Sequence, residues 1–230
     1  MFGRYSTLAA VTAVLMASPA LAMTQDAPTT FLGQNTAAVL SKGVSYFSAG
    51  TGMAPGINYA TSLAGGEFGL GVNGAATLGG LGRGIGLAAS YKYPLAAFGA
   101  VQAAIAANAA VGGLGGAFAL GAGGVSVPLT MDLGQALISV APGVAIPSLG
   151  APGTGLTFGA NVGAQLPVAD KLSGLVTVPV STAGLGAFTL GLRMSPTSTS
   201  HVDFNIGGVT TSPFGITAGT VGVTGHIGWR

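Results

Sequence analysis

The sequence predicts an all-β fold, an antiparallel transmembrane β-barrel of eight to twelve strands, with twelve or ten favoured. In many segments the side chains alternate between apolar and small or polar, and segments of about ten residues with this alternation are typical of strands that face lipid on one side. Charged residues make up only 5% of the chain, against about 25% in a typical soluble domain. Glycine is abundant, with 42 residues among 230.

The first 22 residues are predicted to be a cleaved signal peptide. Arg4 supplies a positive start, residues 8–16 are apolar, and Ala20-Leu21-Ala22 forms a small-x-small cleavage site. Removal after Ala22 reduces the seven Lys and Arg residues to six, against five Asp and Glu. Residues 23–43 then form a periplasmic leader or a small plug, and residues 44–230 form the barrel.

The alternation is clearest in the last segment, 220–229. Val221, Val223 and Trp229 fall on one face, and Thr224 and His226 fall on the other. Twelve segments can be read as strands, which is the upper limit of the count: 44–48, 57–63, 68–78, 85–93, 98–111, 117–127, 135–146, 156–166, 175–180, 188–194, 201–206 and 220–229. An even number of strands places both ends of the chain on the periplasmic side. The connections are short.

Some segments do not fit the barrel simply. Residues 95–120 are almost entirely apolar and also fit a transmembrane helix with small-residue packing faces. Pro142 and Pro179 each remove a donor from the strand ladder, which predicts bulges or strand ends. The Gly123-Gly124 pair predicts a glycine bulge in the sixth strand.

Four polar residues on the inner face of the last three strands form the candidate site. If these strands pair as hairpins, Arg193 lies opposite the region of Val202, and His201 lies opposite the region of Gly225. Asp203 and His226 would then join them near one end of the lumen. Such a cluster is either a constriction or an internal network of ion pairs and hydrogen bonds. A His–Asp pair near a serine such as Ser200 would also suit a lipid hydrolase.

The remaining inner face is small and polar, with few charges. Its other notable members are Lys92, Asn73, Asn161 and Gln165. A lining with so little charge favours small neutral solutes or weak ion selectivity. Aromatic residues toward strand ends or on outward faces fit an interface girdle. They are Tyr46, Tyr59, Tyr91, Tyr93 and Trp229, of which Tyr91, Tyr93 and Trp229 are the candidate interface residues.

Several function classes are not supported by the sequence. The near-neutral charge balance lacks the concentrated basic face that nucleic acid requires. The chain has no cysteine and only two histidines, so we expect no metal site. The glycine-rich runs lack the lysine and serine or threonine of a phosphate loop, and no cofactor is expected. We expect no enzymatic activity.

The signal peptide, the alternating strands and the aromatic terminal strand together resemble the small outer-membrane β-barrel proteins of bacteria, which are porin-like. The resemblance implies localisation in the outer membrane, contact with its lipids, and recognition of the C-terminal strand by the barrel-assembly machinery. It implies a narrow passive channel or a structural envelope protein. The alternatives are a secreted Gly/Ala-rich surface protein that self-assembles through β-segments, and a barrel lipid hydrolase.

Overall fold

The structure is a computed structural model. It describes the following residues: 24–25, 30–31, 34–51, 56–76, 83–114, 117–119, 123–134, 136–146, 156–182, 184–185, 188–212 and 215–230. The predicted signal peptide, 1–22, lies outside the described residues. Among the described residues, no helix is long and apolar enough to cross a membrane.

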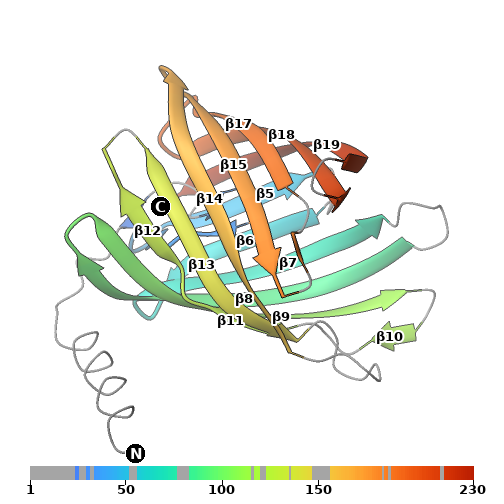
Figure 1. The fold of residues 1–230 in the computed structure, drawn as a ribbon. Helices are drawn as coiled ribbons and strands as arrows, with labels where there is room; N and C mark the ends of the chain where they lie inside the picture. Colours follow the sequence, from blue (N-terminus) through green and yellow to red (C-terminus); the bar gives the residue numbers. More distant parts are fainter. Residues whose placement is uncertain are drawn as a thin grey trace, which may run out of the picture.

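Twelve antiparallel strands close into a barrel, which confirms the predicted fold class and the upper strand count (Figure 1). In chain order they are β5 (Ser45–Gly50), β6 (Gly56–Leu63), β7 (Gly66–Ala76), β8 (Arg83–Phe98), β9 (Val101–Leu114), β11 (Gly123–Ser126) with β12 (Leu129–Asp132), β13 (Leu137–Ile146), β14 (Thr157–Ala169), β15 (Leu172–Ser181), β17 (Phe188–Met194), β18 (Ser200–Ser212) and β19 (Gly215–Trp229). Each strand pairs with its neighbour in sequence, and β19 pairs with β5 to close the ring. The short β10 (Ala117–Ala119) and β16 (Gly184–Leu185) pair antiparallel with the ends of β9 and β15.

The sixth strand differs most from the sequence prediction. It consists of β11 and β12, which both pair with β9 and β13 and are separated by Val127 and Pro128. The break therefore falls at a proline, which has no N–H to donate, and the predicted bulge at Gly123-Gly124 was wrong because both glycines pair in continuous register.

Other prolines also behave differently from the prediction. Pro142 was expected at a bulge or strand end, yet it pairs with Ala160 in unbroken register. Pro179 pairs with Asn161 in unbroken register on one side, but on the other side of β15 the ladder to β17 ends at Thr177 and the pairing with β16 is shifted by one residue, so the predicted interruption occurs on that side only. Register shifts occur instead at Pro94/Ala96 and Pro167/Ala169. The apolar run 95–120 is not a helix in its described part, where it forms the end of β8, β9 and β10.

One end of the barrel, which we call the turn end, carries short turns and the C-terminal residue. Ala64 and Gly65 connect β6 to β7 with positive φ values of 50° and 79°, as a two-residue hairpin turn requires. Similar short connections follow Phe98 and Ala169. The last barrel residue, Trp229, pairs with Ser45 at this end.

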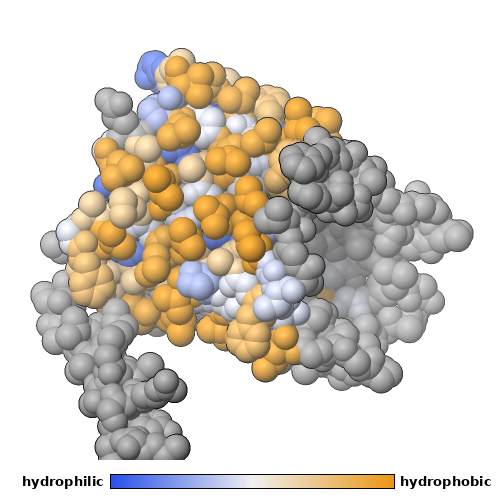
Figure 2. Space-filling model, viewed as in Figure 1, coloured by the Kyte–Doolittle hydropathy of each residue, from blue (hydrophilic) through white to orange (hydrophobic). Residues whose placement is uncertain are grey.

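The outer face of the barrel is apolar on every strand. Large side chains such as Leu70, Phe158 and Val221 are 50%, 58% and 74% exposed. Figure 2 shows apolar side chains spread over the visible wall, with a smaller number of hydrophilic ones between them. Such a surface is unfavourable in water and suits lipid. Because the ring is closed, it offers no barrel edge for the stacking that self-assembly between chains needs.

Candidate functional site

The polar residues of the last three strands meet inside the barrel near the turn end. Arg193 of β17 pairs with Asp203 of β18, and His201 of β18 pairs with His226 of β19. Both pairings lie one residue from the expected positions. Directly paired residues point to the same face, so this register keeps all four side chains inside, where each is at least nine-tenths buried.

Asp203 is the centre of this cluster. Its two carboxylate oxygens accept hydrogen bonds from Arg193 Nε and Nη2, each at 2.7 Å, in a bidentate ion pair. His226 Nε2 lies 3.2 Å from the same carboxylate. Asp203 and Arg193 are only 2% and 4% exposed. A buried charge needs such partners, because desolvation without them is costly.

His201 belongs to a different set of contacts. Its Nδ1 lies 2.7 Å from Ser195 Oγ, and its Nε2 lies 3.3 Å from the carbonyl oxygen of Ser198. Asp203 instead contacts Arg193 and His226. A serine–histidine–carboxylate relay needs the carboxylate on the same imidazole as the serine. The described contacts therefore do not assemble the hydrolase site that the sequence suggested around His201, Asp203 and Ser200.

Tyr46 fills the space beside the two histidines. The sequence placed it at a strand end or on an outward face, but it points inward and is 5% exposed. Its ring centroid lies 5.7 Å from that of His226 and 6.5 Å from that of His201. Its hydroxyl is buried and has no hydrogen-bond partner among the described residues.

A second ion pair lies on another part of the wall. Lys92 of β8 was predicted to face the lumen, and it is 3% exposed there. Its Nζ lies 3.5 Å from Glu67 Oε2 on β7, and the two residues are directly paired. Glu67 was missed by the sequence prediction because that strand was started at Phe68. The alternation of β7, extended by one residue, would have placed Glu67 inside.

The chain before β5 lies inside the barrel against these polar groups. We call residues 34–40 the inner segment; it contains β3 (Gln34–Asn35) and β4 (Val39–Leu40). Residues 36–40 are at most 3% exposed. Ala37 N–H donates to Thr130 Oγ1 on β12 at 2.8 Å, and Leu40 N–H donates to Glu67 Oε2 on β7 at 3.1 Å. The segment therefore contacts separate parts of the inner wall.

Further contacts hold the same part of the chain. Arg193 Nη2 donates to the carbonyl oxygen of Thr30 at 3.1 Å. Thr30 belongs to β2 (Thr30–Phe31), which pairs with β3 and contacts β14 and β15. Leu40 packs in a buried apolar cluster with Val44 and Tyr46. Both ion pairs thus contribute a hydrogen bond to the chain within the lumen.

The rest of the lumen wall is polar and more open. Asn58, Ser90, Asn108 and Asn161 lie on the inner face and are exposed. Of the other predicted lumen residues, Gln165 is half-buried and its Nε2 donates to Ser173 Oγ at 3.3 Å. The backbone of Asn73 pairs with Gly56 and Gly86, and the structure does not describe its side chain.

Many of these polar side chains face a glycine on the next strand. A Cβ atom on Gly222 would lie 2.6 Å from Asn205 Oδ1, and one on Gly69 would lie 2.5 Å from Ser90 Oγ. These distances are too short for a real contact, so the glycines let the polar groups lie against the wall. The same arrangement joins further cross-strand pairs: Asn58–Gly71, Thr224–Gly50, Asn108–Gly124, Ser126–Gly143 and Tyr46–Gly228.

The predicted interface aromatics lie on the outer face. Tyr93 and Trp229 are each 46% exposed. The Trp229 ring lies 6.2 Å from that of Tyr59. Tyr91 is half-buried, and its hydroxyl lies 3.3 Å from the carbonyl oxygen of Leu63 in the neighbouring turn. Tyr91 and Tyr93 lie beside the turn at Ala64 and Gly65, and Trp229 is the last barrel residue, so these three side chains are near the turn end, where an aromatic girdle is expected.

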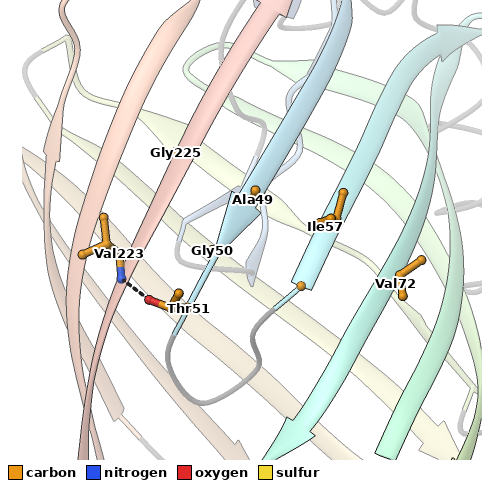
Figure 3. A pocket seen from close by; sticks show the side chains of 8 residues that line it. Ala49, Gly50, Thr51, Ile57, Val72, Val223 and Gly225 are labelled. Atoms are coloured by element: carbon orange, nitrogen blue, oxygen red, sulfur yellow. Dashed lines mark hydrogen bonds between the residues drawn. The ribbon is translucent and has the colours of Figure 1, made fainter.

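The outer wall also carries a shallow apolar depression at the opposite end of β5 (Figure 3). Ile57, Val72 and Val223 border it, and Val223 N–H donates to Thr51 Oγ1 at 3.4 Å. Its apolar lining suits contact with lipid. It is separate from the polar cluster inside the barrel.

Two solved outer-membrane proteins have a similar fold. They are the KdgM porin, in complex with disordered oligogalacturonate, with a TM-score of 0.53, and the NanC porin, with a TM-score of 0.51. Each match covers 81% of this chain and 98% of the other, at 7% sequence identity. No protein-family model and no curated protein matches the sequence. The chain therefore has the fold of a porin-like outer-membrane β-barrel.

Proposed function

We propose that this protein is an outer-membrane barrel that acts as a narrow passive channel for small neutral polar solutes. The observation that carries the proposal is a polar, exposed inner wall inside a closed barrel of twelve strands. Asn58, Ser90 and Asn108 make this wall hydrophilic. The glycines opposite them have no side chain, so these polar groups lie flat against the wall and take up little of the lumen. A barrel of this size leaves room beyond its own side chains, whereas one of about eight strands is just filled by them.

Weak ion selectivity follows from the charges. The described inner wall holds its cations Lys92 and Arg193 in pairs with Glu67 and Asp203. Each pair is neutral as a whole, so it adds little net field for a passing ion. The KdgM porin structure contains oligogalacturonate, which is a polyanion. The paired cations of this chain favour neutral solutes over a polyanion of that kind.

A structural envelope role is the second candidate function. The observation that favours it is the inner segment, because residues 36–40 fill part of the lumen at the turn end. A barrel that remains filled would strengthen the envelope without conducting.

Solute flux distinguishes the two candidates. The mature chain is refolded into phosphatidylcholine vesicles, and osmotic swelling is followed in neutral sugars of increasing size. We expect swelling with small sugars and a reversal potential near zero in a KCl gradient. A permeability ratio above about tenfold for either ion would contradict weak selectivity. Folded protein that gives no swelling, with or without the residues before Ser41, would favour the structural role.

A further inference from the structure

We propose that the inner segment, residues 34–40, is a removable gate that closes this channel at the turn end. The inference rests on the proposed channel function, and its experiment separates the failure of one from the failure of the other. In the structure the gate is closed, since Ala37 and Leu40 are bound to the wall and are 1% and 3% exposed.

The contacts that hold the gate differ from those that build the barrel. Barrel strands are joined by continuous backbone ladders, as between β18 and β19. The inner segment pairs with no barrel strand along a ladder: among its described contacts with the wall are single hydrogen bonds from its backbone to the side chains of Thr130 and Glu67, and Leu40 packs against Val44 and Tyr46. Releasing the segment therefore leaves every barrel ladder intact.

The wall groups have other partners when the gate leaves. Thr130 Oγ1 donates to Ser139 Oγ at 3.2 Å, and Glu67 forms the ion pair with Lys92. Arg193, which bonds to the Thr30 carbonyl, keeps its bidentate pair with Asp203. Loss of the segment thus removes these hydrogen bonds and leaves each charge of the two ion pairs with its partner. This arrangement makes an open state accessible, because an unpaired buried charge would be prohibitive.

A pivot lies between the gate and the first barrel strand. Gly43 has a φ of 81°, and a Cβ placed there would meet nothing within 4 Å. Its N–H donates to Ser62 Oγ at 2.8 Å, and Ser62 N–H donates to the Val44 carbonyl at 3.1 Å. The barrel side of the pivot is fixed by these bonds. The open surroundings of Gly43 leave room for the preceding chain to change direction.

A disulfide lock tests the gate in the full mature chain. Ala37 N lies 2.8 Å from Thr130 Oγ1, so the two Cα atoms lie within the separation of about 7 Å that a disulfide can bridge. The chain has no native cysteine, so Ala37→Cys with Thr130→Cys forms a unique pair. The single variants Ala37→Cys and Thr130→Cys are the matched controls.

We expect the oxidised double variant to pass at least about tenfold less current than the same protein after reduction, while neither single variant responds to the reductant. Equal currents in the oxidised and reduced forms would overturn the gate. If the pair does not cross-link, because its Cβ vectors point apart, the variant that begins at Ser41 decides the gate instead.

A variant that begins at Ser41 separates the two proposals. We expect it to fold and to remain open, with a higher mean current than the full chain. If it conducts like the full chain, the gate is wrong and the channel stands. If folded forms of this variant and of the reduced double variant both fail to conduct, the channel function itself is refuted.

Discussion

Replacing Asp203 by Asn is expected to destabilise the barrel strongly. The carboxylate accepts two bonds of 2.7 Å from Arg193 and lies 3.2 Å from His226 Nε2, and it is 2% exposed. Asn keeps the shape but has one acceptor oxygen, so its amide group faces a guanidinium donor. Removing one partner of a buried pair costs about 3–5 kcal/mol, a large part of the roughly 5–15 kcal/mol that stabilises a typical domain.

The free energy of unfolding can be measured by urea titration of the protein in lipid vesicles. Trp229 is the only tryptophan in the sequence, so its fluorescence reports on the last strand. The control is the double variant Arg193→Met with Asp203→Leu, which removes both charges and should be less destabilised than Asp203→Asn alone. A loss below about 1 kcal/mol for Asp203→Asn, as for a solvated surface pair, would refute the reasoning.

Three further predictions use the same unfolding assay. Tyr46→Phe should leave the free energy of unfolding unchanged or raise it by up to about 1 kcal/mol, because the buried Tyr46 hydroxyl has no partner among the described residues. A fall in the free energy of unfolding would show that the hydroxyl does have a partner. Gly222→Ala should cost about 1–3 kcal/mol, since its Cβ would lie 2.5 Å from the backbone carbonyl oxygen of Thr51, which cannot turn aside as a side chain can, and 2.6 Å from Asn205 Oδ1. The matched control Gly225→Ala, where a Cβ meets nothing within 4 Å, should have little effect. Leu70→Arg on the outer face should cost about 2–4 kcal/mol near the bilayer midplane, and no cost would place that face in water.

The strands were predictable because one physical pattern dominates them. Lipid outside and polar groups inside impose a period of two, as in β17, where Leu190, Leu192 and Met194 are exposed and Arg193 is buried. The pattern failed where proline interrupts a strand without reversing the chain. The predicted strand 85–93 ends just before Pro94, yet β8 continues through this proline with a register shift before turning at Gly99.

The site was less predictable, for two reasons. Alternation gives the face of a residue, so Arg193 and Asp203 were placed inside, but the register that pairs them is set by the neighbouring strands. The inner segment has no alternation to read, because it contacts the wall through backbone groups such as Ala37 N–H. Tyr46 was wrongly expected at the membrane interface, because a tyrosine that faces the lumen and one that faces the interface cannot be told apart by residue type alone.

Single-channel recording of the refolded mature chain in a planar bilayer tests the central claim most directly. Folding is first confirmed by heat-modifiable mobility in a gel. The account predicts discrete current steps with closed intervals in the full chain, and longer open intervals in the variant that begins at Ser41. Folded protein that gives no steps in either form would contradict the claim that this barrel is a channel.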